Sequence, residues 1–168
     1  KAGDYSGSSV RTAGDVNGDG IDDLIIGAFG ADASGERSGS TYVVFGKTSG
    51  FSAVMDLSSF NSNEGFRLDG TASYDYSGQS VSAAGDVNGD GREDVFVGGA
   101  QGNPGKIFIQ NSRGEFITSP TVFNKLYTDA DALFLDADGD KDLDLYVVSG
   151  GYNEYTEKDK ALQDRLYT

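Results

Sequence analysis

Short apolar segments alternate with clusters of Gly, Ser, Asn and Asp along most of the chain. Apolar runs of four to eight residues between turn-forming residues are typical of β-strands, whereas helices need longer runs with a period near 3.6 residues. The pattern is clearest in Thr41-Tyr-Val-Val-Phe45 and Lys106-Ile-Phe-Ile-Gln110. About eleven strands are predicted on this criterion, at 8–14, 23–28, 40–46, 65–69, 79–85, 94–99, 105–110, 115–118, 131–136, 144–149 and 164–168.

The strands belong to a repeat. Residues 4–15 (DYSGSSVRTAGD) return almost unchanged at 75–86 (DYSGQSVSAAGD), and each copy continues through VNGDG and a carboxylate into an apolar strand. A looser third copy contains ADGDKDLD followed by LYVVSG. The Asp-rich loops of the three copies begin 71 and 50 residues apart. A four-stranded propeller blade takes about 40–50 residues plus its long loops, so this spacing predicts one blade per copy.

We therefore expect an all-β chain of about two and three-quarter four-stranded β-propeller-type blades, in a single repeat domain over residues 1–168. Blade 1 covers about 4–70, blade 2 about 75–120, and an incomplete blade 3 about 128–168. Within blade 3, the polar residues 154–163 are expected to form a helical turn or an excursion loop. Closed propellers usually need 4–8 blades. The expectation is therefore a partial propeller, as a piece of a longer protein or a protomer of an assembly.

Acidic residues change this picture, because the formal net charge is −14 and 13 of the 27 acids fall into three clusters. The clusters consist of Asp15, Asp19, Asp22 and Asp23; of Asp86, Asp90, Glu93 and Asp94; and of Asp136, Asp138, Asp140, Asp142 and Asp144. Like charges packed this closely repel one another unless a cation lies among them.

An acidic surface also repels phosphate backbones, so nucleic acid is not expected as a partner. No apolar run approaches the ~18 residues of a membrane span.

The residue types that most catalytic devices need are absent. The chain has no His and no Cys, which excludes Ser-His and Cys-His pairs as well as thiolate metal sites. Paired carboxylates could still hydrolyse glycosidic bonds. However, the clustered acids are accounted for by a metal, and outlying acids such as Glu64, Glu115 and Glu154 form no motif. We therefore expect no enzyme, with a carbohydrate-active module as the less favoured alternative.

The three acidic clusters follow, with one departure, the pattern D-x-[DN]-x-[DN]-G-x-x-D, which suits calcium. Calcium takes six to eight oxygens at about 2.3–2.6 Å. Side-chain oxygens at positions 1, 3 and 5, the carbonyl of position 7 and the carboxylate of position 9 can converge on one ion. The predicted ligands are Asp15, Asn17, Asp19, Ile21 (carbonyl) and Asp23; Asp86, Asn88, Asp90, Arg92 (carbonyl) and Asp94; and Asp136, Asp138, Asp140, Asp142 (carbonyl) and Asp144. Three Ca²⁺ sites result.

The third loop departs from the pattern at position 6, where Lys141 replaces the Gly20 and Gly91 of the other two loops. Glycine accepts a positive φ without penalty, whereas lysine must take an unfavourable backbone angle and adds a positive charge. The additional acid Asp142 partly offsets that charge. None of the loops is an EF-hand, because an apolar residue stands at position 12 and each loop runs into a strand.

Two alternatives to calcium stay open. The loops could be metal-free hairpin turns, in which Asn-Gly and Asp-Gly pairs are favoured anyway. Magnesium is a weaker candidate, because it demands strict octahedral geometry and prefers to keep its water.

The signature DYSGxSV…GDVNGDGxxDxxxGA over residues 4–100 resembles the FG-GAP repeat of integrin α-subunit β-propellers and their bacterial relatives. Residues 101–151 are more similar to the related bacterial VCBS-type calcium repeats. The resemblance implies a calcium-stabilised propeller in a secreted or cell-surface protein, and its relatives serve in adhesion, in matrix-like structures or as rigid modules beside catalytic domains. Where animal repeats carry Phe-Gly, this chain has Tyr5-Ser-Gly7 and Tyr76-Ser-Gly78. This departure leaves the partner open.

The expected function is therefore a calcium-binding extracellular structural or adhesive module, whose partner is a protein or glycan at the cell surface. The alternative is a subunit of a fibre or ring that self-associates through open blade edges, because an unpaired strand edge can pair with another chain. The change of repeat style near Asp86 fits either natural divergence or a composite sequence.

Overall fold

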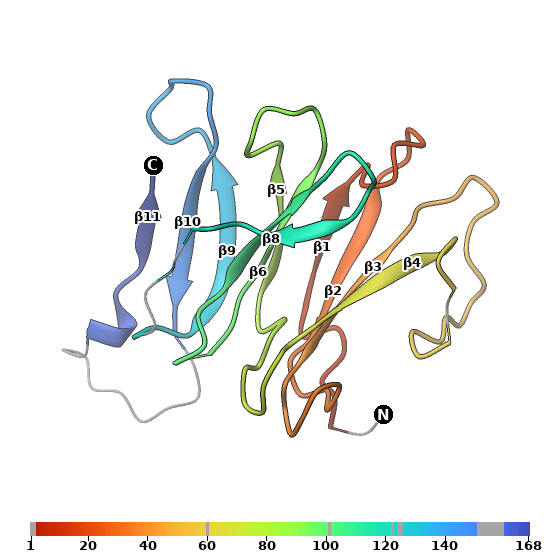
Figure 1. Cartoon of the computed structure of the whole chain (residues 1–168), viewed down its shortest axis with the longest axis horizontal. Coiled ribbons are helices and arrows are strands. Elements are labelled where there is room, and N and C mark those ends of the chain that lie inside the picture. Colours follow the sequence, from red (N-terminus) through yellow and green to blue (C-terminus); the bar gives the residue numbers. More distant parts are fainter. Residues whose placement is uncertain (1–2, 60, 101, 122, 124–125, 151–159) are drawn as a thin grey trace.

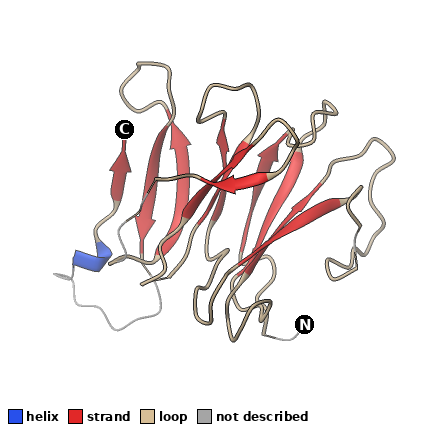
Figure 2. Ribbon diagram, viewed as in Figure 1, coloured by secondary structure: helices blue, strands red, loops and turns tan. Residues whose placement is uncertain are grey.

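The structure is a computed structural model that describes the chain except for residues 1–2, 60, 101, 122, 124–125 and 151–159. Its strands form three antiparallel sheets in which each strand pairs with its neighbour in sequence (Figures 1 and 2). The first sheet contains β1 (Ser9–Gly14), β2 (Asp23–Ala28), β3 (Ser40–Val44) and β4 (Gly65–Asp69). The second contains β5 (Val81–Gly85), β6 (Asp94–Val97), β7 (Lys106–Gln110) and β8 (Phe116–Thr118). The third contains β9 (Asp129–Leu135), β10 (Asp144–Ser149) and β11 (Arg165–Tyr167).

Each of the eleven predicted strands overlaps an observed strand, and the all-β, partial-propeller prediction is confirmed. The largest difference at the start of a strand is shared by β5, which begins two residues late, and β9, which begins two residues early, at Asp129. The polar segment 154–163 falls largely outside the described residues, and its end, Lys160–Leu162, forms a single 3₁₀ turn (Figure 2). No helix in the described part of the chain is long and apolar enough to cross a membrane.

The first strands of the three sheets lie next to one another, because β1 packs against β5 and β5 packs against β9. Apolar side chains fill the two spaces between the sheets. The core between the first and second sheets is built from Ala13, Val16, Ile25, Val43, Val81 and Val95. The core between the second and third contains Phe96, Ile107, Phe123, Ala132, Leu145 and Val147. The stacking of meander sheets through their faces is the arrangement of propeller blades.

A matching irregularity ends the first strand of sheets one and two. The register of β1 shifts between Thr12 and Gly14, and that of β5 shifts between Ala83 and Gly85. Gly14 (φ 73°) and Gly85 (φ 66°) both take the left-handed conformation that glycine accepts most readily. Each bulge lies directly before an acidic loop, so it helps to set the direction in which that loop leaves the sheet.

Candidate metal centres

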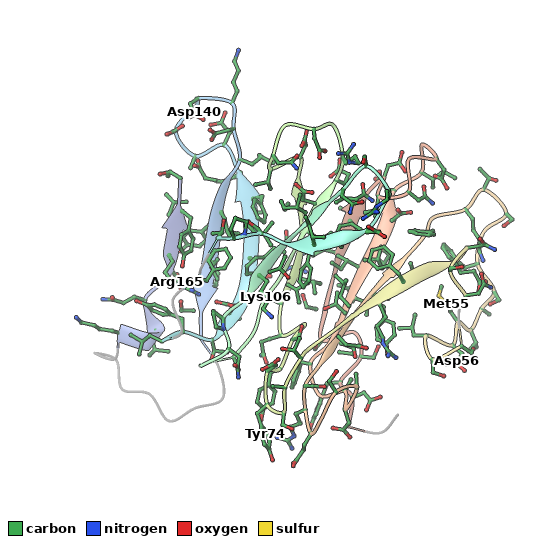
Figure 3. The ribbon with its side chains drawn as sticks, viewed as in Figure 1. Met55, Asp56, Tyr74, Lys106, Asp140 and Arg165 are labelled. Carbon is green, nitrogen blue, oxygen red and sulfur yellow. The ribbon has the colours of Figure 1, made fainter. Side chains whose placement is uncertain are left out.

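The three acidic loops occupy the same place in each sheet, between its first and second strands. They join β1 to β2, β5 to β6 and β9 to β10, and Figure 1 shows all three at the upper side of the molecule. Figure 3 shows Asp140 on the β9–β10 loop, away from the body of the sheets. The fold therefore brings the predicted ligands of each loop together at one end of its blade.

In the first loop, side-chain oxygens turn inward to accept hydrogen bonds from the loop's own backbone. Asp15 accepts from the N–H groups of Asp19 (2.9 Å) and Gly20 (2.8 Å). Asn17 accepts from Asp19 (2.9 Å), and Asp19 from Ile21 (2.9 Å). These side-chain–backbone bonds curl the chain as an oxygen-lined loop requires.

The second loop repeats the same bonds at the corresponding positions. Asp86 accepts from the N–H groups of Asp90 (2.8 Å) and Gly91 (2.7 Å), and Asp90 accepts from the N–H of Arg92 (3.1 Å). One feature differs, because the guanidinium of Arg92 also pairs with the Asp90 carboxylate. The first loop carries the uncharged Ile21 at that position.

The carboxylate at position 9 is buried in all three loops, with exposed fractions of 3% for Asp23, 0% for Asp94 and 1% for Asp144. Burial raises the pKa of Asp23 and of Asp94, although backbone N–H groups that donate to each carboxylate act in the opposite direction. Among the described residues, no Lys or Arg forms an ion pair with any of the three. A buried carboxylate without a cationic partner is costly, and a divalent ion would remove that cost.

The amides that hold the position-9 carboxylates come partly from outside the motif. Val16 donates to Oδ2 of Asp23 (2.9 Å) from within the loop, but Gly46 donates to Oδ1 (2.7 Å) from beyond the third strand. In the second loop, Asp94 accepts from Val87 (3.0 Å) and from Gln110 (2.8 Å), the last residue of β7. Sequence analysis missed Gly46 and Gln110, because neither lies in a loop motif and only the pairing of strands brings them near.

The third loop brings three carboxylates together in spite of its lysine. One carboxylate oxygen each of Asp136, Asp138 and Asp144 lies within 4.8 Å of the others, close enough to share a metal ion. Lys141 has φ 80°, which matches the 84° and 83° of the glycines at position 6 in the other loops. The predicted unfavourable backbone angle of Lys141 is thus confirmed, and the turn forms nevertheless.

Two further acids of the third loop lie against each other. A hydrogen bond with the Asp140 carboxylate, and then the negative charge of that group, raise the pKa of Asp142. A cation in the loop would reduce this repulsion. In all three loops the side chains at positions 1, 3, 5 and 9 offer carboxylate or amide oxygens as metal ligands, and calcium prefers such oxygen ligands. The inward direction of the position-7 carbonyls stays a prediction.

Comparison with known sequences identifies the repeat. The family described as FG-GAP repeat matches residues 6–44, which contain β1 to β3 with the first acidic loop. The family described as FG-GAP-like repeat matches residues 86–147, which contain the second and third loops. The chain belongs to the FG-GAP repeat family. The predicted resemblance is confirmed, and the FG-GAP-like match covers most of the segment compared above with VCBS-type repeats.

Proteins with similar FG-GAP repeats include integrin alpha-4 of Xenopus laevis, 33% identical over 121 residues, which are 70% of this chain and 11% of that protein. Integrin alpha-6 of Homo sapiens is 34% identical over 111 residues, or 64% of this chain and 9% of the integrin. Phosphatidylinositol-glycan-specific phospholipase D of Mus musculus is 29% identical over an alignment of 174 positions, covering 95% of this chain and 20% of that protein. The FG-GAP repeats described here thus span about a tenth to a fifth of the length of these relatives.

Proposed function

We propose that this chain is a calcium-binding, non-enzymatic structural and adhesive module of a secreted or cell-surface protein. One Ca²⁺ in each of the three loops would clamp the connection between the first two strands of a blade. The site residues are the fifteen predicted ligands, and the blades are proposed to span about 4–70, 75–120 and 128–168. A protein or glycan at the cell surface is the proposed partner, supported by the similarity to integrin α subunits.

The observation that carries this proposal is the buried carboxylate at the start of the second strand in each sheet. Asp23, Asp94 and Asp144 each open a strand, and backbone amides alone bind their oxygens in the described residues. Amide donors orient a carboxylate without neutralising its charge, so the position still favours a cation. Three divalent ions would also reduce the formal net charge from −14 to −8.

Calcium suits these loops better than magnesium does, because they offer many oxygens on a flexible turn. Extracellular calcium modules bind with Kd values of about 10⁻⁴–10⁻³ M, which matches the calcium concentration outside cells. The loops join strand to strand with no helix pair that could open in response to the ion. The ions would therefore act as constitutive clamps, and their binding energy would add to folding stability.

The test is thermal unfolding in 2 mM calcium and in EGTA, followed by circular dichroism. At about ten times a Kd of 0.2 mM, each site adds about 1.4 kcal/mol, so three sites raise Tm by several degrees. Magnesium at the same concentration is the matched control and should raise Tm less. An equal Tm in calcium and in EGTA contradicts a structural role for the ion.

A second function, self-association, is favoured by the uncovered face of the third sheet. Leu133, Tyr146 and Leu166 occupy one row across β9, β10 and β11 and are 57%, 36% and 50% exposed. In the second sheet, the residue that corresponds to Tyr146 is Phe96, which is buried against the third sheet. The Tyr146 face thus corresponds to the faces through which the first sheet packs on the second and the second on the third. We propose that a second copy covers it, which would extend the stack toward a ring or fibre.

Light scattering tests this second proposal. The chain should form dimers or larger species as its concentration rises in calcium, and Leu133→Lys should return it to monomer. Val54→Lys, at an apolar residue 83% exposed outside this row, is the control and should leave association unchanged. A monodisperse monomer at high concentration excludes association through this face.

A further inference from the structure

The first two acidic loops are joined by one buried glutamine. The side-chain Nε2 of Gln110 donates a hydrogen bond of 2.7 Å to the carbonyl oxygen of Val16, in the first loop. The main-chain N–H of Gln110 donates a hydrogen bond of 2.8 Å to Oδ1 of Asp94, the last proposed ligand of the second loop. One residue of β7 therefore touches both loops across the boundary between the first and second sheets.

On the side of the first loop, Gln110 and Asp23 hold the same peptide unit from opposite ends. The Val16 carbonyl accepts from Gln110, and the N–H of Asn17 on the other side of that peptide bond donates to Oδ2 of Asp23 at 3.3 Å. The N–H of Val16 donates to the same oxygen at 2.9 Å. Because a peptide unit is planar and rigid, a shift of the Asp23 carboxylate moves the carbonyl that Gln110 binds.

The second loop is tied to the same glutamine twice. Besides the bond to Asp94, the Nε of Arg92 donates a hydrogen bond of 3.2 Å to the carbonyl oxygen of Gln110. The guanidinium of Arg92 also pairs with Asp90, another proposed ligand. Val16, Asp23, Asp94 and Gln110 are all buried, so water does not readily replace a broken link in this chain of bonds.

We propose that calcium binding at the first and second loops is positively coupled through Gln110. An ion in the first loop fixes Asp23, and with it the Val16–Asn17 peptide unit and Gln110, so the second ion binds a loop that is already partly ordered. The proposal rests on calcium binding as proposed above. In the described part of the chain, the Asp144 carboxylate of the third loop accepts one hydrogen bond, from the N–H of Ala137 in its own loop. The third ion is therefore expected to bind independently.

Calorimetric calcium titration of four proteins tests the coupling. An Asp136→Ala background removes the third site and leaves the first two. Adding Asp86→Ala or Asp15→Ala isolates the first or the second site. The coupling ratio is the product of the two binding constants in the two-site protein, divided by the product of the constants of the two single-site proteins. We expect this ratio to be at least about five. Restoring Asp136 should leave this ratio unchanged.

Gln110→Leu removes the bond to Val16 and keeps the main-chain bond to Asp94, so the ratio should fall to about one. Gln163→Leu, the same change at an exposed residue beside the third sheet, is the matched control and should keep the full ratio. If circular dichroism shows that Gln110→Leu is unfolded, Gln110→Met serves instead, because its unbranched side chain resembles glutamine in shape and its thioether has no proton to donate to the carbonyl.

The outcomes separate this proposal from calcium binding itself. If both sites bind calcium but the coupling ratio in the two-site protein is about one, the coupling is overturned and calcium binding is left intact. A ratio that persists in a folded Gln110 variant also overturns it, because the coupling then takes another route. The absence of any binding overturns the proposed function instead.

Discussion

Arg165 and Asp129 form a buried ion pair with 2.6 Å between Nη2 and Oδ1, and their side chains are 10% and 2% exposed. The second oxygen of Asp129 accepts hydrogen bonds from the N–H groups of Gly99 (3.2 Å) and Gly105 (2.8 Å), which lie between β6 and β7 in the second blade. The guanidinium also lies over the ring of Tyr127 at 4.3 Å. A single carboxylate thus joins the last strand, β11, to the first strand of its own sheet and to the neighbouring blade.

Replacing Arg165 with methionine should therefore lower the free energy of unfolding by about 3–5 kcal/mol, since Asp129 would be left buried without its cation. Urea unfolding followed by circular dichroism measures this change. The control is Arg113→Met, which breaks an ion pair with Glu115 whose side chains are 77% and 58% exposed, and a much smaller loss is expected. Equal losses in the two variants contradict a structural role for the Asp129–Arg165 pair.

Lys141→Gly should stabilise the protein by about 1 kcal/mol, because glycine takes the positive φ of this position without the steric cost that lysine bears. It should also strengthen calcium binding in the third loop, since a positive charge leaves the site. Chemical denaturation in EGTA, where no calcium is bound, measures the gain in folding stability separately from the gain in calcium affinity. The reverse change, Gly91→Lys in the second loop, is expected to destabilise by a similar amount. Destabilisation by Lys141→Gly runs against this reasoning.

Arg92→Ile should strengthen calcium binding at the second loop severalfold. The substitution frees the Asp90 carboxylate from its ion pair and makes the loop more negative, as it is in the first loop with Ile21. Calorimetric titration in the Asp15→Ala, Asp136→Ala background measures the affinity of this loop alone. Arg113→Ile removes a positive charge elsewhere on the second blade and is the control. An unchanged or weaker affinity in Arg92→Ile shows that the ion pair does not compete with the metal.

The sequence was sufficient for the parts of the fold that are encoded locally. Each strand is a short apolar run between turn residues, and within each acidic loop the bonds that curl the chain join residues close in sequence, such as Asp15 and Gly20. Even the strained turn at Lys141 could be anticipated, because the repeat aligns it with two glycines.

The links between residues far apart in the sequence could not be predicted in the same way. Gln110 and Val16 are 94 positions apart, and Asp129 and Arg165 are 36 apart, so no periodic pattern or motif relates them. The first pair exists because the first two sheets stack on each other, and the second because β9 and β11 both flank β10 in the third sheet. The early start of β9 also depends on contacts distant in sequence, since Asp129 is held there by the β6–β7 loop and by Arg165 of β11.

The number of calcium ions bound per chain tests the account most directly. Equilibrium dialysis against millimolar calcium should give three ions per chain for the parent protein. Asp23→Asn, Asp94→Asn and Asp144→Asn, each without the buried carboxylate of one loop, should give two, provided that circular dichroism shows the parent fold. A parent chain that binds no calcium, or that binds the same number after all three substitutions, would contradict calcium binding at these loops.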